Sequence, residues 1–78
     1  MATTLEVRAH WDDEAKVWWA ESEDVPGLVT EAATFDELVE NVRELTPDLL
    51  QLNGVQVEGP ELSIRCVAER TAKVRPAA

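Results

Sequence analysis

Two adjacent tryptophans, Trp18 and Trp19, place the strongest constraint on how this chain can fold. They lie in the segment VWWAESEDVPGLVTEA, residues 17–32, whose first part has the composition of a β-strand. Neighbouring residues on a strand point to opposite faces, and a chain of 78 residues forms one domain with a single core. We therefore expect one indole to pack in that core and the other to lie against something outside the monomer.

The charge of the sequence is acidic and unevenly distributed. Arg70, Lys73 and Arg75 give residues 70–78 a charge of +3, which leaves −12 for residues 1–69 within the total of −9. An acidic body repels nucleic acids, since their affinity for proteins comes mainly from Lys and Arg on phosphates. Such a surface suits a basic protein partner. The alternative, that the charge only keeps a small protein soluble, stays open.

The composition favours a folded cytoplasmic protein. Hydrophobic residues make up 45% of the chain, enough for a core, and no run of about 18 apolar residues suggests a membrane span. The first ten residues, MATTLEVRAH, resemble neither a basic leader nor an apolar signal core. Cys66 is the only cysteine, so neither an internal disulfide nor a Cys/His metal box is expected.

The hydrophobic pattern predicts strands at 5–10, 16–22, 28–32 and 62–68, with polar turns at 12–14 and 24–27. Between the last two strands, Thr34 and Glu37 form a capping box that begins a helix, and Asn53-Gly54 ends it. Pro47 interrupts the apolar stripe without changing its phase, which favours one kinked helix over two. A fresh helix start at Pro47 remains the alternative. The stripe consists of Phe35, Leu38, Val42, Leu45, Leu49 and Leu52.

This βββαβ order predicts an α+β fold. The first three strands form an antiparallel meander, and a right-handed crossover places the fourth parallel to the first. The result is a four-stranded mixed sheet of order 3-2-1-4 with one kinked helix on one face. Residues 1–70 form the domain, and residues 71–78 form a flexible C-terminal tail.

Glu21 decides which tryptophan faces the helix. It shares a face with Trp19, and a carboxylate beneath the helix costs several kcal/mol of desolvation unless it is paired. We therefore place Trp18 and the small Ala20 under the helix and Trp19 outward. The open face then has the composition of an interface and carries Glu6, Arg8, Trp19, Glu21, Val29, Glu31 and Val67. Its predicted partner-binding residues are Trp19, Glu21, Val29 and Glu31.

No enzyme emerges from the reactive residues. Strand alternation places His10 and Cys66 on opposite faces, so we do not expect them to form a catalytic pair. We interpret Cys66 as a small core residue rather than a nucleophile. The acids at 12–14 do not match the ligand spacing of a calcium loop, and the carboxylates of Glu21 and Glu31 are better explained as a rim of charge. The isolated glycines make no phosphate-binding loop. We predict no catalytic residues, no metal and no cofactor.

Residues 17–50, VWWAESEDVPGLVTEAATFDELVENVRELTPDLL, resemble the N-terminal domain of HicB-type antitoxins. The resemblance extends over about residues 3–69 and is nearest to a short, uncharacterised branch of that superfamily. It implies a partial RNase H-like fold, in agreement with the predicted order of elements. The matching positions are Trp18, Ala20, Asp24, Val25, Pro26, Gly27, Thr34 and Glu37.

The resemblance also implies a function, namely neutralisation of a small basic HicA-like mRNA-interferase toxin by protein–protein masking, without catalysis. It implies a bacterial, cytoplasmic protein, and we expect a homodimer or a higher homo-oligomer. HicB antitoxins also carry a C-terminal DNA-binding domain that is not matched here, so we expect no direct nucleic acid binding. Two alternatives stay open: an orphan structural or interaction domain, and a small-ligand-binding α/β domain with a cleft opened at Pro47. Dimerisation is a rival explanation for Trp19.

Overall fold

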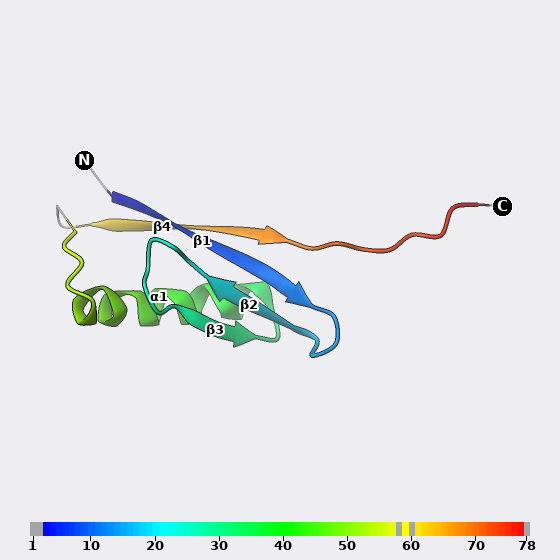
Figure 1. Cartoon of the computed structure of the whole chain (residues 1–78), viewed down its shortest axis with the longest axis horizontal. Helices are drawn as coiled ribbons and strands as arrows, with labels where there is room; N and C mark the ends of the chain where they lie inside the picture. Colours follow the sequence, from blue (N-terminus) through cyan, green and yellow to red (C-terminus); the bar gives the residue numbers. More distant parts are fainter. Residues whose placement is uncertain (1–2, 58, 60, 78) are drawn as a thin grey trace.

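The computed structural model describes residues 3–57, 59 and 61–77, and it confirms the predicted order of elements (Figure 1). Within these residues, no helix is long and apolar enough to cross a bilayer. The elements are β1 (Thr3–Asp12), β2 (Val17–Glu21), β3 (Val29–Ala32), α1 (Phe35–Leu52) and β4 (Leu62–Glu69).

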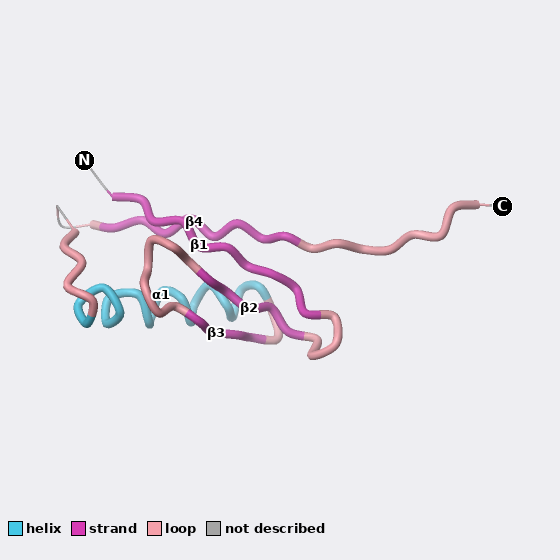
Figure 2. Tube along the Cα trace, in the orientation of Figure 1, coloured by secondary structure: helices cyan, strands magenta, loops and turns pink. Residues whose placement is uncertain are grey.

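The strands form one mixed sheet of order β3-β2-β1-β4, as predicted. β2 pairs antiparallel with both β1 and β3, whereas β4 pairs parallel with β1. Figure 2 shows α1 running behind the sheet, so that one face of the sheet is covered and the other is open. The fold is therefore the predicted α+β arrangement.

The core lies between α1 and the covered face of the sheet. Ala9 on β1 is paired with Ala20 on β2, and both are fully buried. Small side chains at these two positions let the helix approach the sheet closely, which is the role predicted for Ala20. The other buried hydrophobic residues are Leu5, Val7, Val25, Leu28, Leu38, Val42 and Leu50.

The helix is continuous through Pro47, so the alternative of a second helix start there is wrong. It begins as predicted, with the Thr34 side chain accepting a hydrogen bond from the Glu37 N–H at 3.1 Å. The predicted apolar stripe is wrong at Leu45 and Leu52, which are 38% and 81% exposed, whereas Leu49 between them packs against the core.

Thr46 and Leu50 are buried instead. They continue the spacing of four set by Leu38 and Val42, which shows that the sheet meets this flank of the helix. The Thr46 hydroxyl donates to the Val42 carbonyl at 2.7 Å, which satisfies a polar group in the core.

After β4 the chain leaves the body. Residues 70–77 are exposed and run on from the end of β4 (Figures 1 and 2). The first of them is held, because the Arg70 guanidinium lies 4.4 Å from the centre of a Trp11 ring. This extension gives the described chain a long axis of 57 Å, against 24 and 19 Å across.

Candidate protein-binding face

The four predicted partner-binding residues form a two-by-two block on the open face. Trp19 on β2 is paired with Glu31 on β3, and Glu21 is paired with Val29. Paired residues share a face of the sheet, so two apolar and two acidic side chains alternate across neighbouring strands. Val29 is 79% exposed. The register thus brings together residues that lie up to twelve positions apart.

The two tryptophans lie on opposite faces, as the sequence predicts. Trp18 packs against the core, with edge-to-face contacts to Phe35 at 5.6 Å and to Trp11 at 5.5 Å between ring centroids. Trp19 lies on the open face, where its register partner on β1 is His10.

The outward indole is only partly exposed, because its own chain covers part of it. The His10 imidazole stacks on Trp19, with ring centroids 4.5 Å apart and the planes 28° from parallel. His10 Nε2 lies 3.7 Å from a Glu21 carboxylate oxygen and has no hydrogen-bond partner within the described residues. The sequence did not reveal this contact of His10, because only the strand register shows what the imidazole faces.

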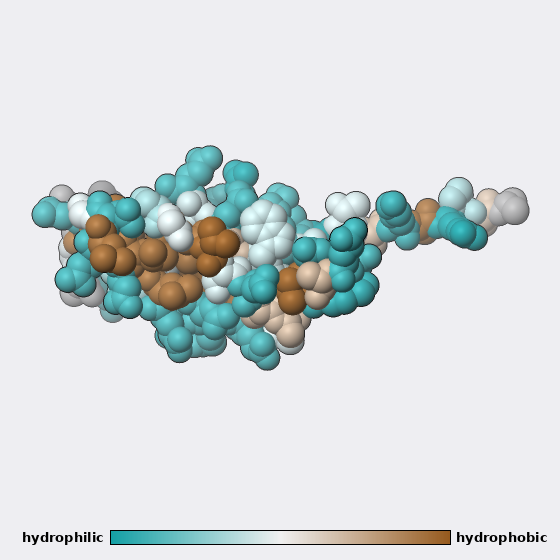
Figure 3. Space-filling view, turned by 60° about the horizontal axis from the view of Figure 1, so that its bottom comes forward, coloured by the Kyte–Doolittle hydropathy of each residue, from teal (hydrophilic) through white to brown (hydrophobic). Residues whose placement is uncertain are grey.

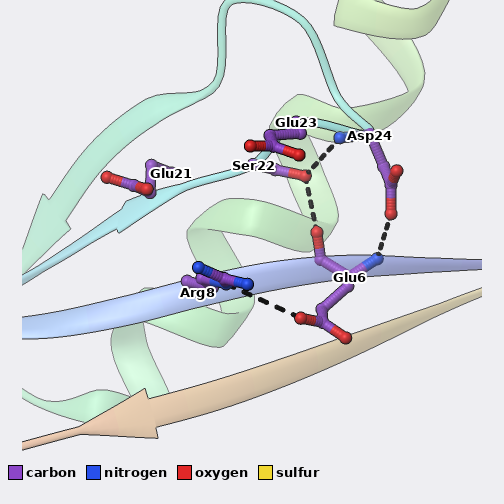
Figure 4. A pocket seen from close by; sticks show the side chains of 6 residues that line it. All are labelled: Glu6, Arg8, Glu21, Ser22, Glu23 and Asp24. Atoms are coloured by element: carbon purple, nitrogen blue, oxygen red, sulfur yellow. Dashed lines mark hydrogen bonds and ion pairs between the residues drawn. The ribbon is translucent and has the colours of Figure 1, made fainter.

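An acidic pocket continues the open face beyond the end of β2 (Figure 4). Its volume is about 240 Å³, and four carboxylates against one guanidinium give its lining a formal charge of −3. The Arg8 Nε atom lies 3.7 Å from a Glu6 carboxylate oxygen, with both side chains substantially exposed. The lining residues are Glu6, Arg8, Glu21, Ser22, Glu23 and Asp24.

Beyond the end of β2, two side chains of this pocket make hydrogen bonds to the β1 backbone in place of strand pairing. Ser22 Oγ donates to the Glu6 carbonyl at 2.6 Å, and Asp24 Oδ2 accepts from the Glu6 N–H at 2.8 Å. Ser22 Oγ also accepts from the N–H groups of Asp24 and Val25, both at 3.1 Å. These bonds fix the turn that buries Val25. Asp24 is thus committed to the fold, a role that the sequence did not reveal.

Two acids of the first turn, Asp12 and Asp13, make hydrogen bonds within that turn. Asp12 Oδ1 accepts from the N–H groups of Glu14 and Ala15 at 3.0 and 3.1 Å. Hydrogen bonds from Lys16 and from the Trp11 indole lower the pKa of the Asp13 carboxyl. Within the part of the chain that the structure describes, no cluster of three His, Cys, Asp or Glu residues is arranged to hold a metal ion.

A second hollow lies on the covered side of the sheet, between α1 and β4. Its volume is about 280 Å³, and Thr46 and Pro47 lie on its helix wall, where the sequence places a possible cleft. Cys66 lies on its strand wall, and burial raises the pKa of this thiol. Cys66 and His10 are on opposite faces, because Cys66 pairs with the buried Val7. We call this hollow the α1/β4 groove; its lining is Val39, Arg43, Thr46, Pro47, Leu62, Ile64 and Cys66.

Comparison with known proteins gives two matches. A family model described as "Domain of unknown function (DUF1902)" matches residues 4–77. The crystal structure of the hypothetical protein TTHA1013 from the extremely thermophilic bacterium Thermus thermophilus superposes with a TM-score of 0.80 at 51% sequence identity. The match covers 91% of this chain and 99% of that one. Among curated proteins, none matches.

Proposed function

The chain belongs to the family of domains of unknown function DUF1902, and from the open face of its sheet we propose that it is a non-catalytic binding module for a basic protein. The observation that carries the proposal is the block formed by Trp19, Glu21, Val29 and Glu31 beside the acidic pocket. A tryptophan among apolar and charged neighbours is the composition of an interaction hot spot. The block and the pocket together give a partner one apolar anchor and several carboxylates.

The resemblance to HicB-type antitoxins suggests the kind of partner. A small basic HicA-like mRNA-interferase toxin fits the acidic face, and the −12 charge of residues 1–69 would steer it there. Binding would neutralise such a toxin by covering its surface, without a chemical step. A cytoplasmic location and self-association are parts of the same proposal.

The binding test uses the double variant Trp19→Ala with Glu21→Lys, which removes the apolar anchor of the face and reverses one of its charges. Loss of a hot-spot tryptophan and reversal of one charge should weaken binding of a HicA-like protein by roughly 100-fold or more. Isothermal titration calorimetry measures this. The matched control is Leu45→Ala with Glu44→Lys, which makes the same kinds of change on the exposed side of α1. Unchanged binding by the Trp19/Glu21 variant would show that the assigned face is wrong.

The salt dependence of the association rate is a second test of the same complex. Exposed charge pairs are screened at high ionic strength, so the association rate should fall as salt is added. Dimerisation through the open face is the rival explanation for Trp19. A change of indole fluorescence with protein concentration would support that rival if the change disappears in Trp19→Ala.

A further inference from the structure

α1 leaves part of the outer strand β4 uncovered. Leu62, Ile64 and Cys66 point toward the helix side of the sheet, yet they are only half-buried and form the strand wall of the α1/β4 groove. Within the described residues, β4 pairs with β1 alone, so its outer backbone N–H and C=O groups have no strand partner. The groove therefore offers apolar side chains next to an open sheet edge.

The segment beyond β4 has a complementary character. Residues 71–77, which we call the tail, extend clear of the body (Figure 3), and Val74 is 84% exposed. In an extended chain Ala72, Val74 and Pro76 lie on one side, while Lys73 and Arg75 lie on the other. The tail continues in the direction of β4 and so points away from the groove of its own chain (Figures 1 and 2).

We propose that the α1/β4 groove binds the tail of a second copy of this chain. Seven extended residues span about 23 Å, whereas the strand wall from Leu62 to Cys66 spans about 13 Å, so the tail is long enough to fill the groove. Its apolar side would lie on Leu62 and Ile64. A strand-like segment there would also meet the open edge of β4.

Charge favours the same occupant. The tail follows directly on Arg70, and residues 70–78 carry +3 against −12 on residues 1–69. The charged residue of the groove lining, Arg43, is paired with Glu40 at 2.9 Å, so the attraction for the tail comes from the acidic body as a whole. Each copy has one groove and one tail, so two copies can exchange tails about a two-fold axis. This contact leaves the open face free and does not depend on its function.

Cys66 makes the contact testable, because the only thiol of the chain lies in the groove. A chain with Cys66→Ala and Val74→Cys carries its thiol in the tail alone. When it is mixed with the wild-type chain and oxidised with diamide, we expect a disulfide between the tail of one copy and the groove of the other. Peptide mass spectrometry identifies this link. The matched control is Cys66→Ala with Val29→Cys, whose thiol is similarly exposed on the open face.

We expect the tail variant to form several-fold more heterodimer than the control. Adding Lys73→Glu and Arg75→Glu to it, or raising the salt concentration, should remove most of this excess. A yield equal to that of the control overturns the proposal. An intrachain disulfide as the main product of Val74→Cys in the wild-type background also overturns it, because the groove would then hold the tail of its own chain. Sedimentation as a monomer at all concentrations does the same.

Discussion

The imidazole of His10 and the indole of Trp19 stack across two antiparallel strands, with their centroids 4.5 Å apart. An aromatic pair of this kind contributes about 0.5–1.5 kcal/mol beyond the area that it buries. The stack covers part of the outward indole and holds it in place on β2. Trp19 is thus partly covered by a side chain of its own sheet.

Truncation of the two tryptophans should separate their roles. Trp18→Ala removes a ring that packs on Phe35 and the core, so we expect it to lower the free energy of unfolding by about 3 kcal/mol. Trp19→Ala loses mainly the stack with His10 and should cost about 1 kcal/mol. Urea unfolding followed by far-UV circular dichroism measures both. An equal or larger cost for Trp19→Ala would contradict the assignment of the two faces.

Ser22→Ala should destabilise the acidic pocket and the turn behind it. The Ser22 hydroxyl donates to the Glu6 carbonyl and accepts from two backbone N–H groups, so its removal leaves three groups without this partner. We expect a loss of about 1–3 kcal/mol. Ser63→Ala, on the open face of β4, is the matched control and should stay within about 0.5 kcal/mol of wild type. Similar effects of the two changes would mean that the Ser22 bonds contribute little.

Pro47→Ala should stabilise the protein. Proline in a helix interior lacks the N–H that would bond to the carbonyl four residues earlier, at an expected cost of about 3 kcal/mol relative to alanine. The greater freedom of the unfolded chain offsets up to about 1 kcal/mol of this gain. Thermal unfolding should show a higher Tm. A lower Tm would indicate that the packing of the proline ring in the α1/β4 groove outweighs the missing hydrogen bond.

The partly buried thiol of Cys66 should make the protein less stable in alkaline solution. Burial raises the pKa of the Cys66 thiol above its usual value of 9.0, so the folded state retains a proton that the unfolded state releases. Stability from this group is therefore complete below about pH 9 and decreases as the pH rises through the folded pKa. The wild type should lose stability relative to Cys66→Ala over that range. Parallel pH profiles for the two chains would contradict the pKa direction.

Local pattern determined much of this fold in advance. The order of elements, the helix start at Thr34 and the opposite faces of Trp18 and Trp19 all follow from periodicities of 2 and 3.6 residues within short segments. The carboxylate of Glu21 was enough to decide which tryptophan faces outward, because the cost of its burial is large.

Only the tertiary structure decided what each exposed position touches. The contact of His10 with Trp19 depends on the strand register, and the bonds from Ser22 and Asp24 to Glu6 join residues at least sixteen positions apart. The position of α1 on the sheet determined that Thr46 is buried while Leu45 is exposed. The same position leaves an open groove beside β4. The physical reason is that sequence periodicity defines the faces of an element, whereas packing between elements defines what covers them.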